Sequence, residues 1–96
     1  TTFELKSATG KVIKAFTQND HELKNLINRK GYIYTAGERL DNIASVAVPI
    51  FNNKENFTGT LSISGWRQFF TNKSVAKFYK ILSGYQNQMK RLVSNE

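Results

Sequence analysis

Small hydroxyl side chains recur at every second position of one uncharged segment, Phe57 to Ser64, which reads FTGTLSIS. Strict alternation of this kind predicts a β-strand with one apolar and one hydroxylic face. The apolar face would carry Phe57, Gly59, Leu61 and Ile63, and the hydroxylic face Thr58, Thr60, Ser62 and Ser64. A row of small hydroxyls inside a compact domain leaves room and hydrogen-bond partners for a small polar molecule. The segment therefore indicates binding chemistry.

Two further features could contribute to such a pocket. The sequence SATGK, Ser7 to Lys11, opens an expected helix, and the first N–H groups and the dipole of a helix attract a carboxylate or phosphate. Ser45 interrupts an otherwise apolar segment, although a buried serine more often bonds to the backbone than to a ligand. Each feature is common by itself, since exposed hydroxylic faces of antiparallel sheets are routine. Only their combination favours a pocket.

Groups able to catalyse a reaction are scarce. The one histidine, His21, begins an expected helix in a polar stretch, where a solvated side chain is the ordinary case. Glu38 and Asp41 share a loop, which does not fix their separation in space. The chain has no cysteine, and it lacks a P-loop, a dinucleotide-binding turn and a nucleophile elbow. We expect no enzyme, and neither a metal nor a cofactor.

The composition fits one soluble domain with a basic surface. The 96 residues, 40% of them hydrophobic, suffice for a single core, and no apolar run approaches the roughly 20 residues of a membrane-spanning helix. The absence of cysteine is compatible with a reducing cytoplasm, where we expect the protein to act. The net charge is +7, with six cations and no acid between Arg67 and Arg91. This excess suits an acidic ligand or a polyanion, but a solvated basic face is favoured.

Two short helices are expected in the first third of the chain. The apolar spacing from Val12 to Phe16 predicts the first, with Ser7 or Thr9 as its N-terminal cap. A second helix should follow, because Asn19-Asp20 with Glu22 resembles a capping box. Leu23, Leu26 and Ile27 would form its apolar face, and Lys30-Gly31 would close it.

Four strands are expected, at Phe3 to Leu5, Tyr32 to Tyr34, Ile43 to Phe51 and Phe57 to Ser64. The polar connection Asn52 to Asn56 has the length of a hairpin loop, so the last two strands should pair antiparallel. Gly65 should end the final strand. Pro49 has no N–H group to donate, and it therefore marks an edge or a bulge.

A long C-terminal helix is expected from Thr71 onward. Its apolar stripe recurs at spacings of three and four and consists of Val75, Phe78, Leu82, Tyr85, Met89 and Leu92. Gly84 should weaken this helix by about 1 kcal/mol relative to alanine without breaking it. The stripe is too short for a sustained coiled coil, so packing against the sheet is favoured.

The order of these motifs resembles one family. The run from Arg29 to Gly65 is similar to the effector-binding domain of the isocitrate-lyase-regulator (IclR-type) family of bacterial and archaeal transcription regulators. The resemblance lies in the Gly31-Tyr32 helix end, in Glu38, in a strand of the pattern siAaPvf and in a strand of the pattern lSvSG. Upstream, SATGKVIKAF is similar to the helix start tasGKalLAf of that family.

The resemblance implies an α/β (α+β) fold of the GAF or profilin-like kind, a curved antiparallel sheet flanked by helices, that binds a small organic acid. Carried over by position, the ligand-binding residues would be Ala8, Thr9, Thr35, Ser45, Ser62 and Ser64. The backbone of Ala8 and Thr9 would hold the carboxylate of an acid such as glyoxylate, pyruvate or a larger aromatic acid. Thr58 and Thr60 would then belong to an ordinary polar face.

The chain also departs from the family pattern. Thr35 stands where some members carry an acid, Ser45 where some carry cysteine, and Trp66 where proline is frequent. The family usually has several tens of residues where only Thr17 to Asn19 separate the two helices here. Residues 1–96 are therefore expected to form a single, partial effector-binding domain without a DNA-binding domain, as a fragment of a longer regulator or as a reduced relative.

The sequence thus favours a homo-oligomeric sensor, a dimer or tetramer, in which an organic acid controls DNA binding by a separate winged helix-turn-helix domain. Two alternatives stay open at this point. A module without a ligand would use an exposed sheet edge to pair with another copy. The basic C-terminal helix would otherwise bind nucleic acid, with an affinity that falls steeply as salt rises.

Overall fold

The computed structural model describes residues 7–37 and 41–94 of the chain. In chain order the elements are α2 (Ala8–Thr17), α3 (His21–Lys30), β1 (Ile33–Ala36), β2 (Ile43–Phe51), β3 (Phe57–Trp66), the 3₁₀ helix η1 (Arg67–Phe69) and α4 (Asn72–Ser94). The strand expected from Phe3 to Leu5, and Glu38 in the loop after β1, lie outside the described residues.

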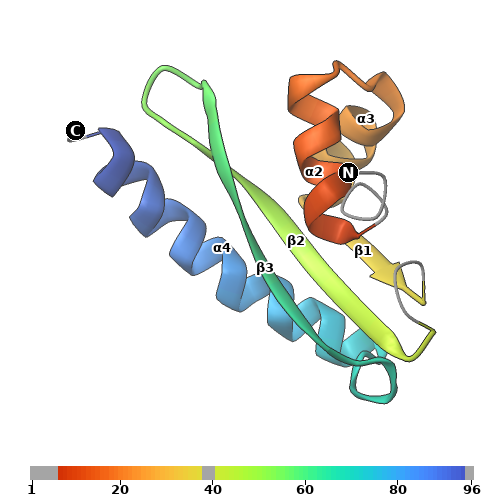
Figure 1. The fold of residues 1–96 in the computed structure, drawn as a ribbon. Coiled ribbons are helices and arrows are strands. Elements are labelled where there is room, and N and C mark those ends of the chain that lie inside the picture. The colour runs from red at the N-terminus through yellow and green to blue at the C-terminus, as the bar shows by residue number, and fades with distance from the viewer. Residues whose placement is uncertain (1–6, 38–40, 95–96) are drawn as a thin grey trace.

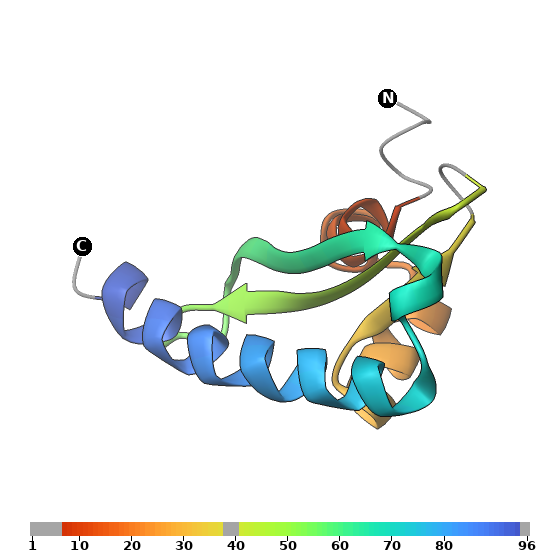
Figure 2. The ribbon, with the colours of Figure 1, turned by 90° about the horizontal axis from the view of Figure 1, so that it is seen from below.

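The strands form an antiparallel sheet in the order β1-β2-β3, and helices cover both of its faces. The short helices α2 and α3 lie together on one side, and α4 runs along the other (Figures 1 and 2). The side chains of the central strand are buried from Ala44 to Ile50. The curved antiparallel sheet with flanking helices and a long C-terminal helix, expected from the sequence, is confirmed.

On the first face, small side chains let α2 approach the sheet closely. Ala8, Val12 and Ala15 recur at spacings of four and three and are fully buried, so they form one helix face against Ala47 of β2 and Ile33 of β1. Larger residues of the same cluster come from α3 and from the ends of the strands, among them Ile27, Leu23 and Phe57.

The ends of both short helices are set by local chemistry. The Ser7 hydroxyl caps α2 by accepting a hydrogen bond from the Gly10 amide at 3.0 Å, and the Asp20 carboxylate caps α3 in the same way. Gly31 ends α3 with a φ of 90°, in the left-handed region that glycine adopts without a steric penalty. Of the two caps expected for the first helix, Ser7 and Thr9, the structure has Ser7, and Asp20 and Gly31 agree with the expected ends of the second helix.

On the second face, α4 packs against the other side of β2. Val75 and Leu82 are buried and join Val46 and Val48 in one cluster. The expected apolar stripe is only partly correct, because Tyr85 and Leu92 are 56% and 61% exposed. The helix continues through Gly84 without interruption.

Strand β3 departs from the expected pattern at both ends. Gly65 does not end it, because Gly65 still pairs with Ala44 and the strand continues to Trp66. At the start, a shift of register between Ile50 and Phe51 inserts Thr58 as an unpaired residue. The alternation is therefore broken, and Phe57 lies on the α2 face instead of the face that carries Leu61 and Ile63.

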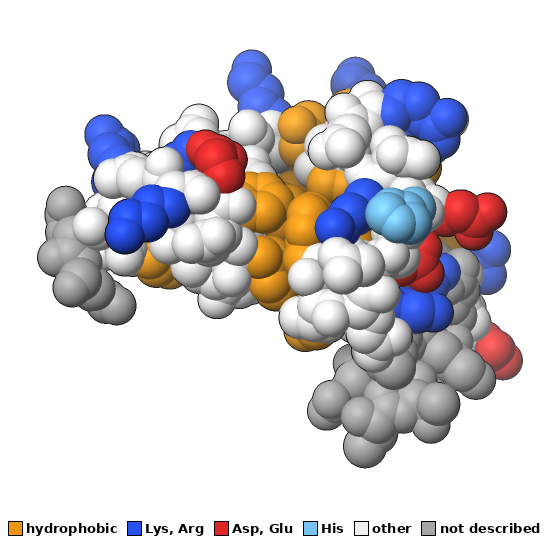
Figure 3. Space-filling model, turned by 90° about the horizontal axis from the view of Figure 1, so that it is seen from above, with side chains coloured by type: hydrophobic (Ala, Val, Ile, Leu, Met, Phe, Trp, Pro, Cys, Tyr) orange, Lys and Arg blue, Asp and Glu red, His pale blue; other side chains and the backbone are white. Residues whose placement is uncertain are grey.

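The bulge gathers three aromatic rings beside the hairpin. The Phe16 ring lies 5.1 Å from that of Phe51 and 5.2 Å from that of Phe57, measured between centroids. Figure 3 shows hydrophobic side chains exposed on this side of the molecule, between the hairpin end and the α2–α3 pair. Phe16 and Phe57 pack against the core cluster on the α2 side of the sheet.

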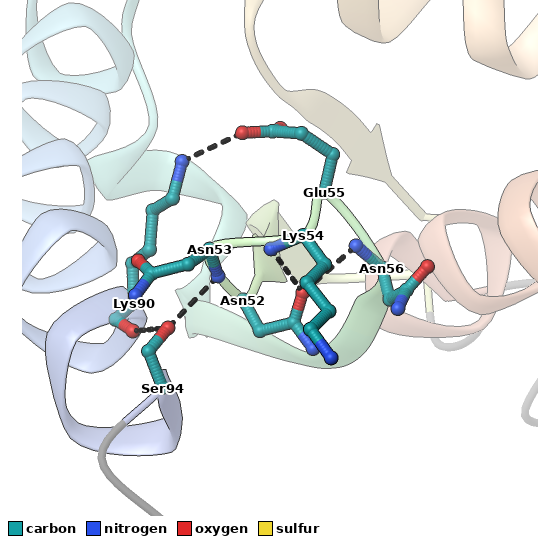
Figure 4. Close-up of polar contacts among 7 residues, drawn as sticks. All are labelled: Asn52, Asn53, Lys54, Glu55, Asn56, Lys90 and Ser94. Atoms are coloured by element: carbon teal, nitrogen blue, oxygen red, sulfur yellow. Dashed lines mark hydrogen bonds and ion pairs between the residues drawn. The ribbon is translucent and has the colours of Figure 1, made fainter.

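The end of α4 is tied to the β2–β3 hairpin by polar contacts (Figure 4). The Lys90 ammonium donates to the Glu55 carboxylate at 2.8 Å, and the Asn53 amide donates to the Ser94 hydroxyl at 2.8 Å. Within the loop, one side-chain oxygen of Asn52 accepts hydrogen bonds from two backbone amides. These contacts fix the loop, but they are exposed to water.

Pro49 lies at an edge position, as its lack of an N–H group predicted. β1 pairs with β2 only as far as Ala47, so Pro49 lies where β2 has no described neighbour on that side. Its carbonyl oxygen accepts a hydrogen bond at 2.5 Å from Gln86 of α4. The helix thus satisfies a group that a further strand would otherwise satisfy.

We predict that burial, and not the hairpin ion pair, holds α4 on the sheet. Leu82→Ala removes a side chain that is 4% exposed and should lower the free energy of unfolding by about 2–5 kcal/mol. Glu55→Gln removes an ion pair in which the acid is 70% exposed and should cost less than about 1 kcal/mol. Urea unfolding of both variants measures the difference, and an equal loss in the two would contradict the assignment.

Candidate functional site

A hollow of about 350 Å³ lies between the start of α2 and the strands β2 and β3. Its wall combines hydroxyl side chains with the first turn of a helix and consists of Ser7, Thr9, Gly10, Ile13, Ser45, Ser62 and Ser64. No ionisable side chain belongs to this wall. Any ligand here would be held by hydrogen bonds and by the helix end.

The pairing register of the sheet brings the serines together. Ser64 lies opposite Ser45, and Ser62 opposite Ala47, so all three serine side chains stand on the face that α2 covers. The hydroxyl oxygens of Ser45 and Ser64 are 2.7 Å apart and share a hydrogen bond in which either can be the donor. The Ser62 hydroxyl has no partner among the described residues.

The start of α2 supplies donors to the same hollow. The Gly10 and Lys11 amides bond to the hydroxyl and the carbonyl of Ser7. Helix geometry leaves the amides of Ala8 and Thr9 without an intrahelical acceptor. Two such N–H groups at the positive end of the helix dipole can hold one carboxylate.

The structure brings some of the expected ligand residues together and leaves others aside. Thr9, Ser45, Ser62 and Ser64 line the hollow. Ala8 does not belong to this wall, and its side chain is fully buried in the core. Thr35 lies in β1 opposite Ser45 and is 6% exposed, but it does not belong to the wall. Their role in ligand binding stays a prediction.

Three wall residues were not expected from the sequence as ligand contacts: Ser7, Gly10 and Ile13. Ile13 follows Thr9 by four residues, so helical spacing places both on the same side of α2. This spacing is the signal that could have identified Ile13.

Thr60, assigned to an ordinary polar face, has a buried hydroxyl oxygen without a partner in the described part of the chain. That assignment is wrong for its hydroxyl.

Candidate catalytic groups do not converge anywhere in the described regions. His21 is exposed at the start of α3, and Asp41 is exposed in the loop before β2. Among residues 7–37 and 41–94, no group of three or more His, Cys, Asp or Glu side chains could hold a metal ion. Within the same residues, no helix has the length and apolar character required to cross a bilayer.

The family of the chain follows from comparison with known proteins. Residues 2–91 match the family described as bacterial transcriptional regulator IclR C-terminal. The chain belongs to this family. Members of the IclR family are regulators of transcription, and residues 2–91 correspond to the C-terminal part of such regulators. No curated protein sequence matches the chain.

Solved structures of IclR regulators share the fold. The Thermotoga maritima IclR matches with a TM-score of 0.81 at 22% identity, over 95% of this chain and 47% of that one. The Alicyclobacillus acidocaldarius regulator matches with a TM-score of 0.65 at 27% identity, over 81% and 34%. The C-terminal domain of Escherichia coli KdgR matches with a TM-score of 0.79 at 17% identity, over 95% and 71%. The chain thus spans less than half of the first two.

We predict that Ser45 and Ser64 are energetically coupled. Ser45 is 8% exposed, so Ser64→Ala leaves its hydroxyl buried without that partner and should cost about 1–3 kcal/mol of stability. The double variant Ser45→Ala, Ser64→Ala removes both groups and should be less destabilised than the sum of the single variants, with a coupling of roughly 1 kcal/mol. Urea unfolding of the four proteins measures this coupling, and strict additivity would contradict the bond.

Proposed function

We propose that this chain is the effector-sensing domain of an IclR-type transcription regulator and that its ligand is a small organic acid bound in the α2–β2–β3 hollow. The observation that carries the proposal is the convergence of Thr9, Ser45, Ser62 and Ser64 on one hollow at the start of a helix. Donors of this kind, with no carboxylate in the wall, suit an anion that is small and rich in oxygen.

The dimensions and chemistry of the hollow support an organic acid. A volume of about 350 Å³ is at the lower end of small-molecule pockets, which span roughly 300–1,000 Å³. The ligand carboxylate would accept from the amides of Ala8 and Thr9, while Ser62 and Ser64 would contact its second oxygen-bearing group. Ile13, which is 39% exposed, would contact a carbon of the ligand.

The proposed mechanism acts on the hydrogen bond between Ser45 and Ser64, because a ligand would determine which of the two hydroxyls is the donor. A ligand that accepts a hydrogen bond from the Ser64 hydroxyl would make the Ser45 hydroxyl the donor to Ser64, and the bond between β2 and β3 would be strengthened. If the same ligand accepts from amides at the start of α2, it joins α2 to the two strands. Such a ligand shifts an equilibrium between two domain arrangements only by its difference in affinity for them. The shift would reach a winged helix-turn-helix domain elsewhere in a homo-oligomeric, cytoplasmic regulator, and the domain itself would catalyse no reaction.

Calorimetric titration of the folded domain with glyoxylate, pyruvate and benzoate tests the proposal. One of these acids should bind, and the double variant Ser62→Ala, Ser64→Ala should weaken its binding at least about tenfold, since the hydrogen bonds from two serine hydroxyls to the ligand are lost. The affinities of Thr9 and Thr35 variants for the same acid then show how much each of these two residues contributes to binding.

Ser83→Ala provides the matched control, because Ser83 lies in α4 on the opposite side of the sheet. Circular dichroism of each variant shows that it remains folded. Absence of binding by the folded wild-type domain to all three acids, or equal affinities of the wild type and the double serine variant, would count against the proposed site.

A further inference from the structure

A second cavity, of about 310 Å³, lies apart from the serine hollow. It lies between the last turn of α3, the strand β1 and the start of α4, at the end of the molecule away from the C-terminus (Figure 2). Its wall includes the apolar side chains of Leu26, Phe70 and Val75, the rings of Tyr32 and Tyr34, and Lys30. None of these residues lines the hollow at α2. A volume of this size, with a largely apolar lining and few polar groups, suits a separate small molecule.

The aromatic rings of this wall are held in place by packing. The rings of Tyr34 and Phe70 are stacked, with centroids 6.4 Å apart and an interplanar angle of 30°. The Tyr32 ring packs on Tyr79 of α4 at 4.9 Å, and a Cβ atom at Gly31 would overlap the Tyr79 hydroxyl, so glycine permits this contact. Tyr34 is nevertheless 39% exposed. A ligand ring can therefore pack beside rings that are already ordered, which lowers the entropic cost of binding.

The charge of the wall favours an anion. Lys30 is the one charged side chain that lines the cavity, and no described carboxylate belongs to the wall. Among the residues that the structure describes, the Lys30 ammonium has no hydrogen-bond or ion-pair partner. Aromatic rings by themselves can bind a cation, but an ammonium group beside them, in a chain of net charge +7, opposes one. The wall therefore suits a ligand that combines an aromatic ring with an acidic group.

We propose that this cavity binds a small aromatic carboxylic acid as a second ligand. The ligand ring packs beside Tyr34 and against Val75, and the Lys30 ammonium donates to its carboxylate. Leu26 and Lys30 are four residues apart in α3, so they lie on the same side of the helix and offer an apolar contact and a charge to one molecule. Recognition at this site requires both the ring and the negative charge.

The serine hollow and this cavity can be occupied at the same time. Ser45 lines the hollow on the α2 face of the sheet, whereas Tyr32 packs on the cluster that contains Val46, on the opposite face. Strand β1 connects the two, because Tyr34 pairs with Val46 and the next residue, Thr35, pairs with Ser45. The second ligand is therefore additional to the acid of the proposed function and does not compete with it for a wall residue.

Heteronuclear NMR titration of the 96-residue chain with 3-phenylpropanoate tests this site. The amide resonances of residues 30–34 and 70–75 should shift on binding. Two further probes separate ring from charge: 3-cyclohexylpropanoate has the same charge without an aromatic face, and 2-phenylethylammonium has the ring with the opposite charge. Each should bind at least about threefold more weakly than 3-phenylpropanoate. A merely apolar cavity would instead prefer the cyclohexyl acid, whose apolar surface is larger.

Matched variants locate the two parts of the recognition. Lys30→Gln should weaken binding of 3-phenylpropanoate at least about threefold, because a charge-assisted contact is lost. Arg29→Gln removes the same charge from an exposed neighbour in α3 that does not line the cavity, and it should change the affinity less than about twofold in about 0.1 M salt. Tyr34→Leu should weaken binding about threefold, whereas Tyr85→Leu, at an exposed position of α4 outside the wall, should not.

Several outcomes would overturn the second site: no shift at about 10 mM acid, shifts confined to the serine hollow, equal affinities for the three probes, or equal effects of Lys30→Gln and Arg29→Gln. The comparison of probes uses the wild-type chain, so it does not depend on the folding of a variant. The folded double variant Ser62→Ala, Ser64→Ala should retain its affinity at residues 30–34 and 70–75. The second site and the proposed function can therefore fail independently of each other.

Discussion

The structure depends on the complete burial of one strand on both faces. β2 carries seven consecutive buried residues, from Ala44 to Ile50, and a strand without solvent-facing positions needs a helix layer on each side. The side chains differ between the faces: Ser45 and Ala47 are small on the side of α2, whereas Val46 and Val48 are larger on the side of α4. This difference in size decides how near each helix can approach.

The hollow lies where the first turn of α2 meets β2 and β3. Because the buried face of α2 consists of Ala8, Val12 and Ala15, its first turn comes down beside Ser45 and the serines of β3. The hydroxyls are held in place by the same register that buries the apolar face of β3, since Ser64 can lie opposite Ser45 only if Ile63 lies opposite Val46. Packing on one face of the sheet thus positions the polar groups on the other.

Membership of the IclR C-terminal family gives this arrangement its regulatory context. The fold is shared at identities of 14–27%, so the backbone arrangement is maintained while most side chains differ. The hollow lies on the side of the sheet where α2 meets β2 and β3, and its wall includes the exposed residues Ser62 and Ser64.

The sequence by itself determined the described helices and strands in their order, and the termini of some of them, but not both ends of β1 and β3. Asp20 and Gly31 bound α3, the segment Ile43 to Phe51 is β2 as expected, and the hydroxyl alternation correctly indicated one face of β3 at Ser62 and Ser64. These features depend on local backbone chemistry and on side-chain periodicity, which the sequence contains directly.

Only the tertiary structure decided which residues meet. The bulge at Thr58 moved Phe57 to the other face, and Tyr85 and Leu92 fell outside the buried row of α4. Ile13 came to line the hollow, whereas Thr35 did not. Periodicity gives the angle of a side chain around its own element, but the distance between elements depends on the sizes of all side chains packed between them. The residues packed between α2 and the sheet set this distance, and polar residues from separate elements therefore line one hollow.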